Sequence, residues 1–382
     1  MKDRHRVVFL GHTASLSGGE IAIANLLGAL AGVDAHVLLA EDGPIVERFR
    51  AAGARVDVVP LGERSRTLHR HEVAGIGAVQ PAVDAVRYAA GLAARIRRLR
   101  PDVVHTISLK SALYGGTAGR LARVPVVWSI QDRIALDYQP ASVVKMVRTA
   151  SRVVPNAIIA NSAATASTLP RGRVPIDVVH PAVPVLPQAP ARDASPYRVG
   201  IVGRLSAWKG QHVFLDAFAK AFAGTDAQAR LIGAPLFGEE AYEADLHAQV
   251  ERLGLADRVE FRGHRDDVAA ELAALDVVVH ASTVPEPFGQ VVVEAMGMGR
   301  PIIAAAAGGP LEIVTDGTDG LLTPPGDADA LAAAMTRLAD DPELSGRLVA
   351  AARTKAPQFA PDAAAAATQS VYDRVLHHRR AR

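Results

Sequence analysis

The stretch ASTVPEPFGQVVVEAMGMGRPIIA, from Ala281 to Ala304, decides how the rest of the chain is interpreted. The run DVVVHAS predicts a strand before it, and QVVVEAMGMG predicts a helix after Gly289. Glu286 therefore falls on a strand-to-helix loop, and Glu294 falls about one and a half turns into the helix, facing the same opening. A helix that begins beside a glycine offers backbone N–H groups and a positive dipole end to an anion. For this stretch alone, two solvated glutamates beside a buried helix remain the alternative.

The composition predicts a folded protein with more than one domain. The chain has 382 residues, of which 49% are hydrophobic and 21% are charged, so a sizeable core is available. Its net charge is only +2, and no basic patch is interleaved with aromatic residues. Nucleic acid is therefore not an expected partner.

The chain contains no cysteine, which excludes disulfides and thiolate metal sites and fits a reducing compartment. The N-terminal MKDRHRVVFLGHT passes from charged residues directly into an expected strand, and its apolar run is too short for a signal peptide. No apolar run approaches the length of a membrane span. We expect a cytoplasmic location.

Short valine-rich runs alternate with longer helix-like stretches, which is typical of parallel α/β architecture. In the first half the expected strands are 6–10, 35–40, 54–59, 101–106, 125–130 and 156–160. In the second half they are YRVGIVG, ARLIG, RVEFRG, DVVVHAS, RPIIAAA and GLLTP. The fold class is therefore predicted to be two doubly wound, Rossmann-like α/β domains, with a ligand cleft between the carboxyl ends of their sheets.

A proline- and alanine-rich segment, PVLPQAPARDASP, separates the two halves. We predict a first domain over 1–183, a linker over 184–197, a second domain over 198–360 and a C-terminal helix over 361–382. The segment from Leu61 to Gln80, with His69, His71 and Glu72, is expected to be an irregular loop near an opening.

A glycine-rich loop follows the first expected strand in GHTASLSGGEIAIANLL. Gly18 and Gly19 open a helix there, and such a loop lets the backbone approach a phosphate closely. The loop matches neither G-x-G-x-x-G nor a Walker loop. A plain strand-to-helix turn is the alternative.

Two cations follow the first expected strand of the second half, in VGRLSAWKGQHVFLDAF. Arg204 provides a guanidinium fork and Lys209 a point ammonium, and together they suit a diphosphate. A solvated Arg/Lys pair is the alternative.

Three polar residues, His105, Gln131 and Asp132, lie at strand ends of the first domain, where a ligand of that domain would bind. Taken singly, each is more often a structural hydrogen-bonding residue than a catalytic one. Asp327 and Asp329 form a D-x-D, which we interpret as a helix N-cap rather than a metal site. The thirteen histidines show no metal-ligand spacing.

Taken together, these motifs resemble the retaining nucleotide-sugar glycosyltransferases of the GT-B fold, family 4. The resemblance is strongest over about 198–326, where GRLSAWKG, FRGHRDDV, EPFGQVVVEAMGMGRPIIA, GGPLEIV and DGLLTPPGD follow the family order. It implies a transferase that uses a UDP- or GDP-type sugar donor, with no cofactor and no metal. The acceptor would be a small molecule, a saccharide or a lipid.

The resemblance also implies roles for single residues. Arg204 and Lys209 would hold the diphosphate, and Glu294 would bind the ribose hydroxyls. Glu286 would have a positioning and electrostatic role at the sugar. The backbone of Phe288, Gly289 and Gln290 would contact sugar and phosphates, and Gly263, His264 and Arg265 would flank the base. The C-terminal helix is expected to cross back onto the first domain.

One position departs from the family pattern, because Gln131 stands where many members carry a histidine near the reacting sugar. A glutamine can orient a hydroxyl but cannot act as a general base near neutral pH. Asp132, His105 or the donor phosphate would then have to take the acceptor proton.

Two other functions fit the same sequence, a nucleotide-sugar epimerase and a sugar-nucleotide binding protein without turnover. The basic stretch RYAAGLAARIRRLR, from Arg87 to Arg100, could also contact an anionic membrane surface. We favour the alternative, a helix packed on its sheet with its arginines in water.

Overall fold

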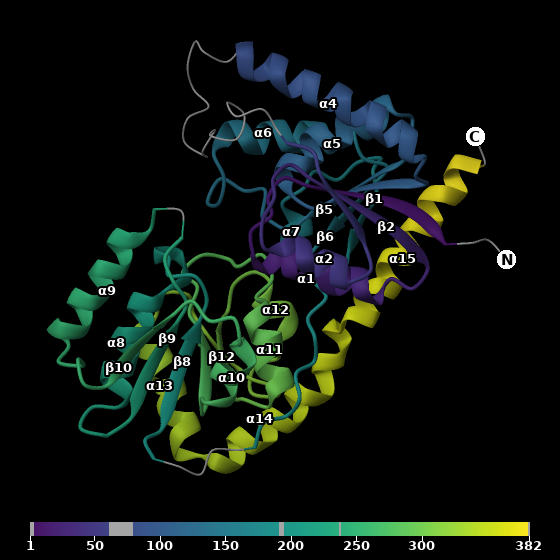
Figure 1. The fold of residues 1–382 in the computed structure, drawn as a ribbon. Helices are drawn as coiled ribbons and strands as arrows, with labels where there is room; N and C mark the ends of the chain where they lie inside the picture. Colours follow the sequence, from purple (N-terminus) through teal and green to yellow (C-terminus); the bar gives the residue numbers. More distant parts are fainter. Residues whose placement is uncertain (1–3, 61–78, 191–194, 237, 381–382) are drawn as a thin grey trace. The chain divides into compact units, whose positions relative to one another are not determined.

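The computed structural model describes residues 4–60, 79–190, 195–236 and 238–380. Two compact units are present, Met1–Ala182 together with Pro361–Arg382, and Val183–Ala360. Each contains one sheet with helices on both faces (Figure 1). Most of the loop expected between Leu61 and Gln80, including both of its histidines, lies outside the described residues.

The first unit is built on a parallel sheet in the order β3-β2-β1-β4-β5-β6-β7. Six of these strands match the predicted ones, whereas β7 was not predicted. The middle strands are buried on both faces, which explains their continuous valine and isoleucine runs. The strands are β1 His5–Gly11, β2 Val33–Leu39, β3 Arg55–Val58, β4 Val103–Thr106, β5 Val126–Ile130, β6 Ala157–Ala160 and β7 Ile176–Val178.

Helices cover both faces of this sheet (Figure 1). One core layer lies under α4, α5 and α6 and includes Leu92, Ile96 and Trp128. The other lies under α1, α2 and α15 and includes Phe49 and Tyr372. The helices are α1 Gly18–Ala29, α2 Ile45–Ala51, α4 Val79–Leu99, α5 Leu109–Leu121, α6 Ala141–Ala150, α7 Ala163–Ser167 and α15 Pro361–Arg380.

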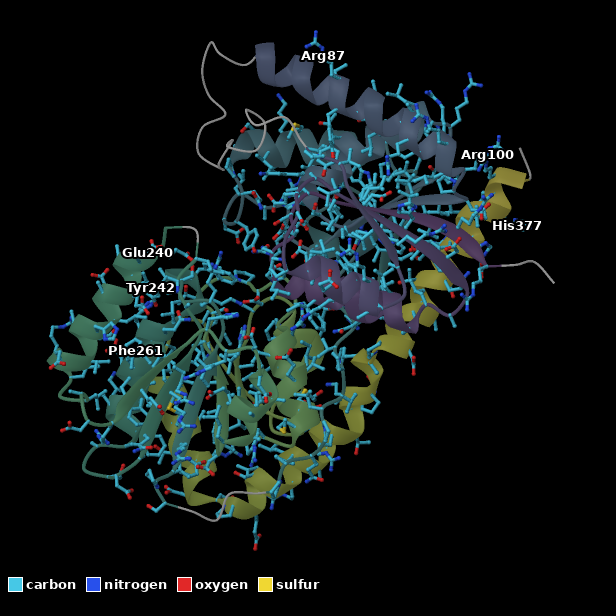
Figure 2. The ribbon with its side chains drawn as sticks, viewed as in Figure 1. Arg87, Arg100, Glu240, Tyr242, Phe261 and His377 are labelled. Atoms are coloured by element: carbon cyan, nitrogen blue, oxygen red, sulfur yellow. The ribbon has the colours of Figure 1, made fainter. Side chains whose placement is uncertain are left out.

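The basic helix α4 packs its apolar side into the first unit. Leu92 and Ile96 are buried there, and Arg95 pairs with Asp57 at 2.5 Å. Arg87 points away from the sheet (Figure 2). The unit's own core therefore covers the apolar face of α4. None of the helices described is both long and apolar enough to cross a membrane.

The second unit contains a parallel sheet in the order β10-β9-β8-β11-β12-β13. All six strands match the runs predicted for the second half. Two doubly wound domains are thereby confirmed. The strands are β8 Arg198–Val202, β9 Gln228–Ile232, β10 Val259–Gly263, β11 Val277–His280, β12 Ile302–Ala305 and β13 Leu321–Thr323.

The helices of the second unit bury one core around Phe214 and Met335 and another around Val292 and Met296. They are η1 Ala207–Lys209, α8 Gln211–Ala221, α9 Glu240–Arg252, α10 Val268–Ala273, α11 Gln290–Met298, α12 Pro310–Ile313, α13 Ala328–Asp340, α14 Pro342–Lys355 and η2 Ala356–Phe359.

The D-x-D is a helix cap, as predicted. The Asp327 carboxylate accepts hydrogen bonds from the backbone N–H groups of Asp329 and Ala330 at the start of α13. Asp329 pairs with Lys220 at 2.6 Å. Both carboxylates thus have structural partners.

The proline-rich segment after residue 183 is bound to the second unit over residues 184–190. The Ala189 N–H donates to the Met298 carbonyl at 3.1 Å, and Arg300 donates to the Pro190 carbonyl at 2.8 Å. Gln188 accepts a hydrogen bond from Arg353. This part of the predicted linker therefore packs beside the end of α11.

Candidate functional site

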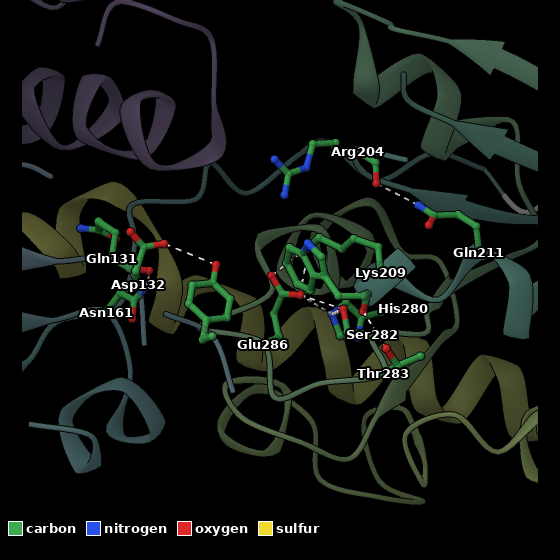
Figure 3. A network of polar contacts seen from close by, with 12 residues as sticks. Gln131, Asp132, Asn161, Arg204, Lys209, Gln211, His280, Ser282, Thr283 and Glu286 are labelled. Carbon is green, nitrogen blue, oxygen red and sulfur yellow. Dashed lines mark hydrogen bonds and ion pairs between the residues drawn. The ribbon is translucent and has the colours of Figure 1, made fainter. Parts of the chain in front are cut away.

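The loops after β8 and β11, two neighbouring strands, bring Lys209 and Glu286 together. Lys209 ends η1, which follows β8, and Glu286 lies on the loop between β11 and α11. The Lys209 Nζ lies 2.8 Å from Oε1 and 2.9 Å from Oε2 of Glu286 (Figure 3). Two residues singled out in the sequence thus form a direct ion pair.

Glu286 is held by side chains and by backbone. The Ser282 hydroxyl donates to Oε2 at 2.7 Å, and His280 Nε2 lies 3.4 Å from the same oxygen (Figure 3). The Gly309 N–H donates to the Glu286 carbonyl at 2.9 Å. A Cβ on Gly308, whose φ is +76°, would lie 2.1 Å from that carbonyl oxygen, so only glycine fits beside it.

The electrostatics keep Glu286 ionised, although the residue is only 7% exposed. Burial by itself would raise the pKa of the carboxyl, but the Lys209 ammonium and the contact with His280 outweigh it and hold the pKa well below its usual range. Glu286 is therefore an anion at neutral pH and cannot donate a proton as a general acid.

Arg204 lies close to this ion pair in the same unit (Figure 3). Its Nε is 3.3 Å from Oε2 of Glu239, which also accepts a hydrogen bond from the Ser206 hydroxyl. The Trp208 ring has the Lys209 Nζ 4.3 Å from its centroid and the Arg204 Cζ at 6.0 Å. One aromatic ring therefore contacts both cations.

Glu294 lies on α11 and is partly buried. Burial raises the pKa of its carboxyl to about 7. Throughout the described ranges no side chain or backbone group forms a hydrogen bond or ion pair with this carboxyl. Its polar atoms therefore remain available to a ligand.

The start of α11 has no side-chain cap. Gly289 is the N-cap residue, with a φ of +103°. The Phe288 ring is buried and contacts Phe359, with the ring centroids 5.8 Å apart. Only the backbone of Phe288 can therefore take part in a site, whereas the Gln290 side chain is partly exposed.

The segment predicted to flank a base lies further along the sheet, because β9 separates β10 from β8. The Gly263 carbonyl accepts a hydrogen bond from the Gly233 N–H at 2.9 Å. His264 is exposed and lies 3.5 Å from Asp266, and the Arg265 Nε lies 3.3 Å from Glu271. These three residues form no hydrogen bond or ion pair with Lys209 or Glu286 in the ranges that the structure covers.

In the first unit, the glycine-rich loop lies next to the end of β5. Gly18 and Gly19 begin α1, and a Cβ on Gly19 would lie 4.0 Å from Cγ of Gln131. Glu20, on the first turn of α1, is buried and accepts a hydrogen bond from the Ser17 hydroxyl. Burial and the nearby Asp132 raise the pKa of Glu20 despite that hydrogen bond.

Gln131 and Asp132 both form hydrogen bonds with neighbouring side chains. The side-chain amide of Gln131 donates to the Ser129 hydroxyl at 2.7 Å, and the backbone carbonyl of Gln131 accepts from the side-chain amide of Asn161 at 2.8 Å. The Tyr138 hydroxyl donates to Asp132 at 3.3 Å (Figure 3). The structure thus groups Gly19, Gln131 and Asp132.

His105 differs from the acceptor-side position expected for it. The side chain is 1% exposed, and its Nδ1 lies 2.6 Å from the Tyr372 hydroxyl of α15. Burial lowers its pKa to about 3. This histidine is part of the core beneath the C-terminal helix and offers no surface to an acceptor.

Four residues of the second-unit site were not among those predicted from the sequence. His280 and Ser282 follow the valine run of β11, so their position after a buried strand was a usable signal. Trp208 adjoins Lys209 in the quoted motif. The sequence gives no indication that Glu239 belongs to the site, because this residue lies on the loop between β9 and α9, whose path hydrophobic periodicity does not predict. Within the described parts of the chain, no cluster of three or more His, Asp or Glu side chains could hold a metal ion.

Comparisons with known proteins cover both units. A family model described as "Glycosyl transferases group 1" matches residues 184–355, and one described as "Glycosyl transferase 4-like domain" matches residues 17–182. A D-inositol 3-phosphate glycosyltransferase of Streptomyces griseus is 32% identical over 327 residues, which cover 74% of this chain and 69% of that protein.

Two further proteins are similar to this chain. A 2-deoxystreptamine glucosyltransferase of Streptomyces kanamyceticus is 35% identical over 182 residues, which cover 47% of this chain and 46% of that protein. The crystal structure of Anabaena Alr3699/HepE in complex with UDP and glucose matches with a TM-score of 0.83 at 27% identity, covering 96% of this chain and 100% of that chain.

Proposed function

The chain belongs to the group 1 glycosyl transferases of family 4 and has their GT-B fold, and we propose that it moves a sugar from a UDP- or GDP-type nucleotide diphosphate sugar to an acceptor hydroxyl, with retention of anomeric configuration. The observation that carries this proposal is the Lys209–Glu286 ion pair with Arg204 beside it. The Anabaena structure, which contains UDP and glucose, supports a donor of this kind.

The cations act on the leaving group. When the bond between the sugar carbon and the phosphate oxygen breaks, negative charge grows on the nucleoside diphosphate. Lys209 is already held in place by Glu286, and Trp208 contacts both Lys209 and Arg204, so the two cations can stabilise that charge with little reorganisation of their own side chains. The start of α11 adds a positive dipole end.

The carboxylates bind hydroxyl groups. Glu286 is ionised, so it accepts hydrogen bonds from the sugar and stabilises positive charge at the reacting carbon. We assign it no covalent bond to the sugar, and retention then follows from attack on the same face that the diphosphate leaves. Glu294, whose carboxyl has no hydrogen-bonding partner among the described residues, would bind the ribose hydroxyls.

The acceptor hydroxyl attacks the sugar carbon and loses its proton as the new bond forms. His105 is in the core and Gln131 cannot accept the proton, which leaves Asp132 or an oxygen of the departing phosphate. The relatives named for D-inositol 3-phosphate and 2-deoxystreptamine support a small hydroxyl-bearing acceptor, bound by the first unit. No metal is required in this scheme, because Arg204 and Lys209 supply the positive charge.

A donor screen tests the proposal. Thermal-shift and calorimetric binding of UDP-, GDP- and dTDP-sugars would identify the donor, and product formation with cyclitol and saccharide acceptors would follow. We expect NMR of the product to show the donor's anomeric configuration. An inverted linkage would contradict retention. A new nucleotide sugar formed without acceptor would identify an epimerase, and tight binding without transfer to any acceptor would identify a binding protein.

A further inference from the structure

Arg204 is paired with a carboxylate that the proposed reaction does not use. Its Nε lies 3.3 Å from Oε2 of Glu239, and the two side chains are 26% and 27% exposed. The other carboxylate oxygen of Glu239 accepts a hydrogen bond from the Ser206 hydroxyl, and Ser206 is buried. Gly238, with a φ of +85°, turns the chain just before Glu239, which is the N-cap residue of α9. The loop before α9 therefore positions the Glu239 carboxylate beside Arg204.

The two ion pairs of the site differ in how firmly each carboxylate is held. Glu286 contacts Lys209, Ser282 and His280 in a buried cluster, so it stays in place when a ligand approaches the lysine. Glu239 lies 3.3 Å from Arg204 without forming a hydrogen bond to it, and its side chain is 27% exposed, against 10% for Glu286. A phosphate oxygen can make a charge-assisted hydrogen bond to a guanidinium, which Oε2 of Glu239 does not make to Arg204. Of the two carboxylates, Glu239 is therefore the one that a phosphate can displace from its cation.

We propose that Glu239 is an internal counter-anion that occupies the Arg204 guanidinium in the absence of donor and is displaced by the donor's diphosphate. This rests on the proposed function, which assigns Arg204 to the diphosphate. Glu239 is then a positioning residue that acts through Arg204. Its charge weakens the binding of nucleoside diphosphate, and its return to Arg204 favours release of that product.

The test is Glu239→Gln, which keeps the side chain's length and an oxygen for Ser206 but removes the charge. We expect the Kd of UDP or of GDP, whichever binds the wild type, to fall about fivefold, the scale of one partly exposed ion pair. The Kd of the matching nucleoside, uridine or guanosine, should not change, because it has no phosphate to compete with the carboxylate. Glu239→Ala should agree with Glu239→Gln.

The matched control is Glu240→Gln, which changes a neighbouring glutamate at the start of α9 (Figure 2). It should leave both Kd values within error of the wild type. Weaker diphosphate binding by both Glu239 variants would overturn the inference, because Glu239 would then serve to hold Arg204 in its binding position. An equal Kd in wild type and variants would overturn it as well. If neither UDP nor GDP bound the wild type, the proposed function itself would fail, and this inference with it.

Discussion

The loops at the carboxyl ends of the two sheets carry different electrostatic arrangements, although both sheets are parallel and covered by helices on both faces. In the second unit, Lys209 and Arg204 each meet a carboxylate. In the first unit, the carboxyl groups of Glu20 and Asp132 lie near one another and accept hydrogen bonds from hydroxyl groups. Equivalent places in two related folds thus offer different chemistry.

This difference agrees with the general rule for open α/β sheets, in which the fold determines where a ligand binds and the side chains determine which ligand binds. Two cations such as Arg204 and Lys209 suit a diphosphate, whereas carboxyl, amide and hydroxyl groups suit an uncharged hydroxyl-bearing molecule. Substitutions in the two loops should therefore have separable effects, on the donor in one case and on the acceptor in the other.

The largest effect is expected from Lys209→Ala. Turnover should fall about 10²–10³-fold, the scale of losing one preorganised group that stabilises charge in the transition state. Steady-state kinetics with the identified donor would measure it. Lys220→Ala, which breaks an exposed pair with Asp329, is the matched control and should keep full turnover. Near wild-type turnover in a folded Lys209→Ala would contradict the donor-site assignment.

The second largest effect is expected in the pH dependence of the free energy of unfolding, to which Glu294 contributes. Its pKa in the folded protein, about 7, lies above the ordinary value of 4.5, so the unfolded chain ionises first as the pH rises. The free energy of unfolding should therefore fall between about pH 4.5 and 7, by up to about 3 kcal/mol. Urea unfolding at several pH values would show this slope in the wild type and a smaller one in Glu294→Gln. If Glu343→Gln, at an exposed site, reduced the slope equally, Glu294 would not be its source.

A third prediction separates structure from catalysis in the first unit. Tyr372→Phe leaves the buried His105 Nδ1 without its hydroxyl partner, which should lower the free energy of unfolding by about 1–3 kcal/mol. Turnover per folded molecule should stay unchanged. If Tyr372→Phe lost turnover while its free energy of unfolding stayed unchanged, His105 would take part in binding or activating the acceptor.

A smaller effect is expected from Gln131→Ala. Transfer to the acceptor should fall about tenfold, the scale of one neutral hydrogen bond in the transition state. Calorimetry should give an unchanged Kd for the nucleoside diphosphate, because this side chain belongs to the acceptor side. A weakened nucleotide Kd would instead place Gln131 at the donor.

The smallest effect is expected from removal of metal ions. Activity in EDTA should match activity in buffer, because Arg204 and Lys209 supply the positive charge and Asp327 is occupied as a helix cap. Loss of activity that Mg²⁺ restores would show that a metal takes part.

The strands and the cationic motif were predictable because their signals are local. A buried parallel strand needs a short run of β-branched residues, and twelve such runs matched observed strands. The strand β7 was missed because it has three residues and is only partly buried. His105 was placed wrongly relative to the core because the helix that covers it comes from far along the chain, at Tyr372.

The sequence by itself determined the alternation of strands and helices, the loops that end at the carboxyl edge of each sheet, and the presence of Arg204, Lys209, Glu286 and Glu294 on or beside those loops. Only the tertiary structure decided that Lys209 meets Glu286, that Arg204 meets Glu239, and that Glu286 is ionised while the pKa of Glu294 is raised. The physical reason is that periodicity depends on near neighbours in the chain. Ion pairing and desolvation depend on distances and burial that exist only once distant segments have packed.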